Sequence, residues 1–339
     1  MKKRYIFSLF ILIILVGCSG SKAEKFSDSF LSFDTYIQLD GYTKDKEEFD
    51  KYYKGAKLEF ERYHQLFDAY NNYEGVNNLK MVNDNAGKKA VKVDKELYDL
   101  VDQSIKYYND SYKKNNIALA PVVLVYKDIM KDYDDGKKVS HPSMSLLKEK
   151  AKCTSIGNIE LQGDNKIYLK ESCARIDVGS VAKGYAADKV ADKLNKEGLD
   201  SGILNAGGNV VVIGKKPGNK DFKIGIADPK NPNSYALTVD ASDTNIVTSG
   251  DYQRFYEIDG VKYNHITDPD TLKPGNINKS VSIISDDGLL ADYFSTESFM
   301  LNINQIKELS RKYKFEYIVI DKNDKLTMSE GINDAVEVK

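Results

Sequence analysis

The stretch Ile176-Asp177-Val178-Gly179-Ser180-Val181-Ala182-Lys183-Gly184-Tyr185 joins two local patterns. The pattern predicts a strand that ends at Asp177, followed by a turn of small residues. From Ser180 to Glu197 the apolar residues recur at helical spacing, and Gly198 is suited to end that helix. Backbone N–H groups at a helix start attract anions, and Lys183 adds a positive charge one turn later. The stretch therefore predicts an anion site, although an ordinary strand–turn–helix connection has the same pattern.

The segments on both sides of this stretch predict a mixed fold. After Gly198 the pattern changes to short strands separated by Gly, Asn, Asp and Pro. No Pro- or Gly-rich linker divides the chain, so we expect one α+β domain over residues 28–339. Outside the central stretch, the clearest predictions are a first strand over 30–39 and helices over 46–67, 95–112 and 290–301.

The composition excludes several classes of function. The chain has 339 residues, with 49 Lys+Arg against 51 Asp+Glu and a formal net charge of -2. This balance argues against a nucleic-acid-binding protein that depends on a basic surface. With only 3 histidines and 3 cysteines, a His-rich or Cys-rich metal site is excluded. Any bound metal should therefore be a hard cation on oxygen ligands.

The N-terminus has the pattern of a secretory signal. Positive residues 2–4 precede the apolar run 5–16, and Leu15-Val16-Gly17-Cys18 resembles the bacterial lipobox. We therefore expect a signal peptide over 1–17, a lipid on Cys18 and a tether over 18–27. This places the chain on the extracytoplasmic face of the bacterial membrane, held by its lipid anchor. The alternative is a plain signal peptide with an incidental cysteine.

Two cysteines flank a predicted β-hairpin. Alternating segments lie on either side of Gly163-Asp164-Asn165, and this turn is equidistant from Cys153 and Cys173. Outside the cytoplasm a disulfide would persist. We expect these two cysteines to pair across the hairpin; two buried free thiols are the alternative.

Three further clusters carry chemistry. Asn205-Ala206-Gly207-Gly208 lets the backbone approach a ligand closely. His265 lies in a loop with Thr267, Asp268 and Asp270, which is where binding and catalytic groups tend to occur. Asp292 and Thr296 are four residues apart, share a helix face and offer the oxygen atoms that Mg²⁺ prefers. Each cluster taken alone also has an ordinary structural interpretation.

In this order and spacing, together with Thr248-Ser249-Gly250-Asp251-Tyr252, the clusters resemble the FAD:protein FMN transferase family, the ApbE-like lipoproteins. The resemblance covers about residues 30–301. It implies a T-fold-like α+β catalytic domain that uses FAD and Mg²⁺. Such enzymes move FMN from FAD onto a Ser or Thr hydroxyl of an acceptor protein and release AMP. The acceptor sites resemble Ser/Thr-Gly-Ala-Ser/Thr.

The resemblance also implies roles for individual residues. The magnesium ligands fall on Asp292, Thr296 and Ser180. His265 and Asp268 border the phosphates, and His265 is favoured for proton removal from the incoming hydroxyl. The flavin nucleotide contacts fall on Phe33, Tyr70, Asn116, Ile117, Ala118, Asp177, Lys183, Gly207, Gly208 and Thr267.

The chain departs from the family pattern at three places. Phe33 replaces the usual Met after the first strand, and we expect its ring to stack on the flavin or the adenine. The segment at Ile117-Ala118 lacks the family's carboxylate, and Leu272 replaces a glycine. Two rival functions stay open: a Mg²⁺-dependent FAD pyrophosphatase giving FMN and AMP, and a non-catalytic flavin- or nutrient-binding lipoprotein.

Overall fold

The computed structural model describes residues 23–338. The predicted signal peptide and Cys18 lie outside the described residues. Residues 24–27, which we assigned to the tether, are instead the start of the first strand. No helix of residues 23–338 is long and apolar enough to cross a membrane.

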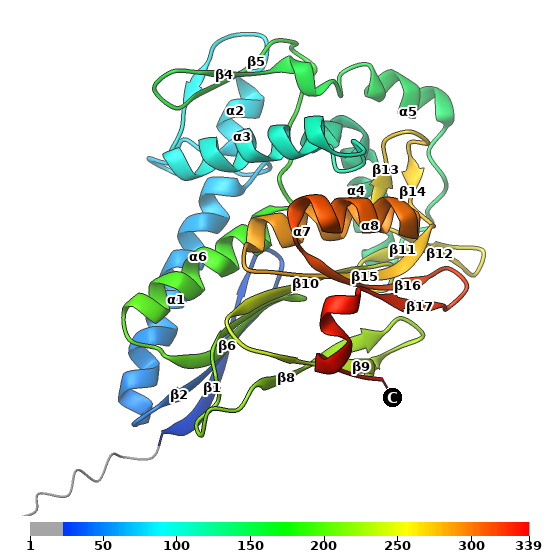
Figure 1. Cartoon of the computed structure of the whole chain (residues 1–339). Helices are drawn as coiled ribbons and strands as arrows, with labels where there is room; N and C mark the ends of the chain where they lie inside the picture. Colours follow the sequence, from blue (N-terminus) through cyan, green and yellow to red (C-terminus); the bar gives the residue numbers. More distant parts are fainter. Residues whose placement is uncertain (1–22, 339) are drawn as a thin grey trace, which may run out of the picture.

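An antiparallel sheet of eight strands forms the centre of the molecule (Figure 1). Its strand order is β1-β2-β6-β7-β10-β15-β16-β17, so segments from both ends of the chain meet in one sheet. The strands are β1 Glu24–Ser32, β2 Thr35–Thr43, β6 Ser201–Ala206, β7 Asn209–Gly214, β10 Thr244–Gly250, β15 Asn278–Ser285, β16 Glu316–Asp321 and β17 Leu326–Met328.

The single strand predicted over 30–39 is wrong. The segment is the inner part of a hairpin in which Ser32 pairs with Thr35. Phe33 and Asp34 form its two-residue turn with φ of 51° and 54°. Positive φ at both turn positions gives the twist that such hairpins need, and Gly or Asn normally supplies it. The sequence lacks that signal here.

Helices cover one face of the sheet, on the upper side in Figure 1. They are α1 Lys46–Phe67, α6 Ala182–Lys196, α7 Gly288–Phe299 and α8 Ile303–Tyr313. The predicted helix 46–67 is confirmed, and the helix predicted over 290–301 begins and ends two residues earlier as α7. Every residue of α7 except Thr296 is buried, because α7 packs against β10, β15 and α6. Polar side chains of α7 are therefore held inside the protein.

A smaller sheet packs on the opposite face of the central sheet. It has the order β18-β9-β8, with β8 Phe222–Asp228, β9 Asn231–Ala241 and β18 Val336–Val338. Phe222 and Ile224 from this sheet form a common core with Val212, Ile246 and Ile318 of the central sheet. The hairpins of β11 Phe255–Ile258 with β12 Val261–Asn264 and of β13 Thr267–Asp268 with β14 Lys273–Pro274 lie elsewhere, where Tyr256 and Leu272 share a core with Val122 and Tyr126. The short helix η3 Glu330–Ala335 contacts β9.

The segment between α1 and α6 forms a cap over the helical face (Figure 1). It contains α2 Leu79–Asp84, β3 Val91–Lys92, α3 Lys95–Asp110, η1 Ile117–Leu119, α4 Ala120–Asp134, α5 Met144–Ala151, η2 Ile156–Asn158, β4 Ile159–Gln162 and β5 Lys166–Leu169. The predicted hairpin is β4–β5. A disulfide joins Cys153 to Cys173, with 5.7 Å between the Cα atoms; both cysteines lie beyond the ends of the paired strands.

Candidate functional site

A cavity of about 560 Å³ lies where the cap meets the edge of the sheet and the helices. Every predicted cluster contributes to its lining, although the clusters are far apart in the sequence. The lining includes ten of the predicted site residues: Asn116, Ile117, Asp177, Ser180, Lys183, Gly207, His265, Thr267, Asp292 and Thr296. Phe33, Tyr70, Ala118, Gly208 and Asp268 are not among the lining residues.

The central stretch reaches the cavity as an irregular segment. No strand ends at Asp177; instead Asn83 brackets Ile176, accepting its N–H at 2.9 Å and donating to its carbonyl at 2.9 Å. The helix begins at Ala182 rather than Ser180, because the N–H groups of Val181 and Ala182 both bond to the Val178 carbonyl. Ser180 therefore sits in the turn before α6, facing the cavity.

Asp292 is a buried carboxylate at the cavity wall. It is 4% exposed, and its Oδ2 accepts the Gly184 N–H at 2.8 Å. Burial raises the pKa of this carboxyl, against the opposing effects of the Lys183 charge and the Gly184 hydrogen bond. A buried carboxylate with so little compensation is suited to a cation that arrives with the substrate.

The oxygen atoms around Asp292 fit a magnesium ion. Thr296, one turn further along α7, has its Oγ1 3.4 Å from the Ser249 Oγ. The Ser180 Oγ donates its hydrogen to the Asn115 Oδ1 at 2.8 Å. The lone pairs of this hydroxyl and the Ser180 backbone carbonyl stay available as metal ligands. Within residues 23–338 no group of three His, Cys, Asp or Glu side chains gathers to hold a metal. One carboxylate with neutral oxygens is a donor set for Mg²⁺, which usually completes its shell with water and substrate phosphates.

The sequence analysis missed the residues that hold Ser180. Asn115 is 4% exposed, and its Nδ2 donates to the Tyr293 carbonyl at 3.0 Å. Glu297, fully buried in α7, accepts the Asn115 backbone N–H at 2.5 Å. Helix α7 thus carries both Asp292 and Glu297, the residue that holds the loop containing Asn115. A glutamate inside an otherwise buried helix was the available signal.

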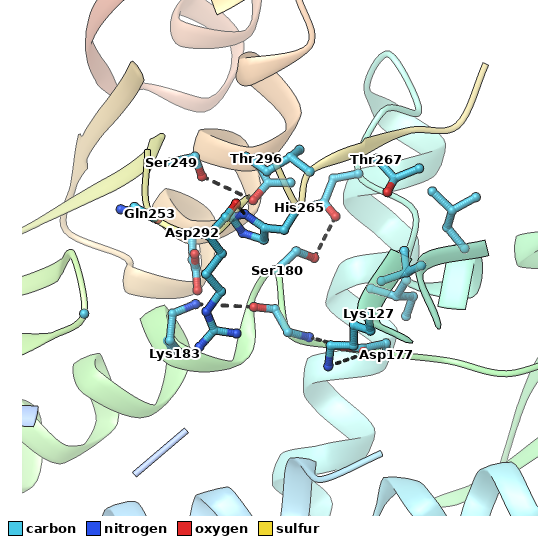
Figure 2. Close-up of a pocket in the computed structure, with 18 of the residues that line it drawn as sticks. Lys127, Asp177, Ser180, Lys183, Ser249, Gln253, His265, Thr267, Asp292 and Thr296 are labelled. Carbon is cyan, nitrogen blue, oxygen red and sulfur yellow. Dashed lines mark hydrogen bonds and ion pairs between the residues drawn. The ribbon is translucent and has the colours of Figure 1, made fainter. Parts of the chain in front are cut away.

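Asp177 belongs to a charged and aromatic group at the opposite side of the site. The Tyr70 hydroxyl donates to the Asp177 carboxylate. The Lys127 Nζ lies 3.7 Å from that carboxylate and 3.7 Å from the centre of the Tyr70 ring. Tyr70 and Asp177 both line an adjoining pocket of about 210 Å³. In the view of Figure 2, Ser180 lies between Asp177 and the group formed by Asp292, Thr296 and His265.

His265 lines the cavity but Asp268 does not. The backbone N–H of His265 donates to the Arg254 carbonyl at 3.1 Å, and its Nδ1 lies 3.3 Å from the same oxygen. A carbonyl only accepts, so Nδ1 carries the hydrogen and Nε2 is the free acceptor. Burial, followed by the charges of Arg254 and Lys183, lowers the pKa of His265 to about 4. Asp268 instead forms an ion pair with Lys114 at 2.8 Å.

Phe33 does not take the place that the sequence suggested. Its ring packs edge-on against Phe60 and His64, with centroid distances of 6.3 and 5.4 Å. The next residues, Asp34 and Thr35, reach the cavity instead. Gly207 has φ of 60°, and a Cβ there would collide with Thr35, so this position requires glycine.

Two residues of the cavity wall have a buried polar atom without a partner. The Thr267 Oγ1 and the Asn209 Oδ1 have no hydrogen-bond partner among residues 23–338, and both residues line the cavity. Buried polar atoms are normally satisfied, so these two are exceptions in the wall of the site. The end of β10 adds the lining residues Thr248 and Ser249, and the segment after it adds Tyr252, Gln253 and Arg254.

The chain is similar to several known proteins over most of its length. The FAD:protein FMN transferase of Treponema pallidum (strain Nichols) is 30% identical over 277 residues, covering 77% of this chain and 75% of that protein. The FAD:protein FMN transferase of Vibrio cholerae is 23% identical over 330 residues, 95% of each chain. The solved structure of the ApbE protein from Thermotoga maritima has a TM-score of 0.82 at 23% identity, covering 92% of this chain and 99% of that one. The flavin transferase ApbE from Vibrio cholerae gives 0.78 at 21% identity, with 92% and 99% covered.

The two structural likenesses confirm the expected single α+β domain of the ApbE type. The family model for ApbE matches residues 33–319, which includes the whole of the cavity. With that match and the similarity to the Treponema protein, the chain belongs to the ApbE family.

Proposed function

We propose that this protein transfers FMN from FAD to a Ser or Thr hydroxyl of an acceptor protein, in a Mg²⁺-dependent reaction that releases AMP. The broader statement, that the chain is a flavin transferase of the FAD:protein FMN transferase class, follows from its family and its relatives. The observation that carries the finer proposal is the buried Asp292 carboxylate, with no ion-pair partner among residues 23–338, in a cavity that Ser180 and Thr296 also line.

The charges around the cavity suit a pyrophosphate. Lys183, Arg254 and Lys114 line it and would attract the anionic centre of FAD. Asp292, Thr296 and Ser180 would hold Mg²⁺, which supplies charge neutralisation on the phosphate oxygens. The Tyr70 and Asp177 group, with the Asn116–Ala118 segment, would bind the nucleotide beyond the phosphates.

His265 is the residue best suited to take the proton of the attacking hydroxyl. Its neutral ring has a free Nε2, and the low pKa keeps it unprotonated at physiological pH. An anionic pyrophosphate beside Lys183 and Arg254 would offset the two charges that weaken this base. The hydroxyl oxygen would then attack the FMN phosphorus, and AMP would leave. Asp268 is paired with Lys114, so we assign it the positioning of that lysine.

The proposal is tested with the purified full-length chain, FAD, Mg²⁺ and a peptide containing Ser-Gly-Ala-Thr. We expect peptide-bound flavin and an equal amount of AMP, and loss of both with EDTA. Asp292→Asn should lower the rate by about a hundredfold or more, since it removes the single carboxylate of the metal site.

Asp188→Asn is the matched control. Asp188 is also a largely buried acid whose pKa is raised by burial, but it bonds to Asn245 at 3.0 Å and does not line the cavity. It should retain the wild-type rate. Free FMN and AMP without peptide-bound flavin would replace the proposal with FAD hydrolysis. Binding of FAD with no turnover would indicate a non-catalytic flavin-binding protein.

The lipid on Cys18, the extracytoplasmic location and the Ser/Thr-Gly-Ala-Ser/Thr acceptor motif are parts of the same proposal. They rest on the lipobox-like sequence and on the family resemblance. An enzyme held at that membrane face would serve acceptor proteins exposed there.

A further inference from the structure

A second and larger cavity lies beside the catalytic one. It measures about 740 Å³ and is formed by α5, the turn between β8 and β9, β12, β14 and the residues before β15. Five lysines belong to its lining, and we call it the lysine groove: Lys230, Lys262, Lys273, Lys279 and Lys322. None of the predicted flavin or metal ligands lines it, so the groove lies outside the site described above.

A thin wall separates the lysine groove from the catalytic cavity. Tyr252 lines both. Asn264 lines the groove, while the next residue, His265, lines the cavity. Asn264 is held firmly, since its Nδ2 donates to the Gly275 carbonyl at 2.8 Å and its Oδ1 accepts the Ile266 N–H at 3.0 Å. A chain lying in the groove would therefore pass close to His265.

The groove is cationic. Its only lining carboxylate among the described residues is Asp251, whose pKa is raised by burial. Lys230 and Lys279 share one partner, Asp324, at 3.1 and 2.6 Å. The ion pairs of residues 23–338 do not include the other three groove lysines. Excess positive charge in a concave surface attracts acidic ligands and speeds their association.

Apolar side chains are exposed at the same place. Met144 and Val261 line the groove with 37% and 52% exposure. Exposed apolar groups gathered beside charges are typical of a protein-binding surface. A small anion such as free phosphate would make no use of them.

The other neighbouring pocket is a poorer candidate for a protein substrate. It has about 210 Å³ and shares Tyr70 and Asp177 with the group assigned to the nucleotide. Its Lys80 is already paired with Asp84. A polypeptide substrate must approach the pyrophosphate from another side, and the lysine groove adjoins the cavity at Tyr252.

We propose that the lysine groove docks the acceptor protein, through an acidic segment with apolar side chains next to the flavinylated Ser or Thr. This inference rests on the proposed function and adds to it the place and the charge of the second substrate. Lysines on the rim would contact acidic residues, and Met144 and Val261 would contact the apolar ones.

The test uses two peptides around the same Ser-Gly-Ala-Thr core, one flanked by Asp and Leu and the other by Lys and Leu. The wild-type chain should flavinylate the acidic peptide with a lower KM, and 0.5 M NaCl should reduce this preference because salt screens exposed charges. Lys273→Glu with Lys322→Glu should raise KM for the acidic peptide about tenfold. The half-saturating FAD concentration and kcat should not change.

Lys57→Glu with Lys89→Glu is the matched control. Both lysines are exposed and lie outside the cavities, and the pair changes the net charge by the same amount. It should leave KM for the acidic peptide unchanged. An equal KM increase in the control, or equal KM values for the two peptides in the wild type, would overturn the docking site. Absence of flavin transfer to either peptide by the wild type would instead contradict the proposed function.

Discussion

At the scale of single residues, His265 depends on its surroundings for its chemistry. Burial and the charges of Arg254 and Lys183 favour its neutral form. These are the same charges that would attract the FAD pyrophosphate, so the substrate itself would restore the basicity of the ring. His265 was predicted from its place among aspartates. Its pKa, however, is lowered by Arg254 and Lys183, which the sequence pattern did not connect with it.

The low pKa of His265 predicts a pH dependence of stability. The pKa is about 6.5 in the unfolded chain and about 4 in the folded one, so the unfolded state binds more protons between these values. The free energy of unfolding should therefore fall as the pH drops from 6.5 to 4. His265→Gln should show a smaller loss between pH 7 and pH 5 in urea unfolding. His141→Gln is the control, and equal losses in wild type and His265→Gln would contradict this account.

At the scale of elements, the crossing of α6 and α7 positions Asp292, the carboxylate of the metal site proposed above. Gly184 in α6 and Gly288 in α7 face each other: a Cβ on Gly184 would lie 2.5 Å from the Asp292 Cβ, and one on Gly288 would lie 2.6 Å from the Gly184 carbonyl oxygen. Only glycines allow this approach, and it lets the Gly184 N–H reach the Asp292 carboxylate.

Gly184→Ala should separate the two helices at this point. We expect a loss of about 2 kcal/mol in the free energy of unfolding, as for overpacked cores. The Mg²⁺ concentration that gives half-maximal transfer should also rise. Gly55→Ala in α1 is the matched change, because the nearest atom to its Cβ is 3.8 Å away. It should be neutral or stabilising by up to about 1 kcal/mol. Urea unfolding measures both, and equal effects would refute the crossing argument.

Periodicity was sufficient for many elements. The apolar spacing of α1 and the turn of the β4–β5 hairpin follow from local sequence alone, and both were predicted. The turn at Phe33 and Asp34 was not, because its residues lack the usual turn chemistry. The segment at Ile176 has a strand-like sequence but pairs with no strand. The Asn83 side chain binds the Ile176 backbone N–H and carbonyl instead. Such side-chain substitutes arise only from tertiary packing.

The residues of the candidate site also divide into those that local motifs predict and those that only tertiary contacts reveal. The lining residues Asp292, Thr296, His265 and Thr267 lie in motifs, so their clustering was predictable. Glu297 was not found, since its part is to bind backbone N–H groups of a loop distant in sequence. Long-range contacts of this kind leave no periodic signal.

At the scale of the whole molecule, the N-terminal strand β1 forms one edge of the central sheet, and the lipid proposed on Cys18 would precede that edge. Cys18→Ser should release the protein from the membrane fraction without lowering its transfer rate in solution, since residues between 34 and 300 line the catalytic cavity. Detergent phase partition and mass spectrometry of the N-terminal peptide measure this, with Ser19→Ala as the control. A membrane-bound Cys18→Ser variant would exclude lipidation at this cysteine.

The Cys153–Cys173 disulfide forms and persists only in an oxidising compartment. The residue after Cys153, Thr154, accepts the Asn116 Nδ2 at 3.0 Å, and Asn116 lines the catalytic cavity. Thiols stay reduced in the cytosol. A chain retained there would hold the cavity wall at Asn116 by non-covalent contacts alone, among them the hydrogen bond to Thr154. On the export proposed above, the cross-link beside Asn116 would form only after the chain had left the cytosol.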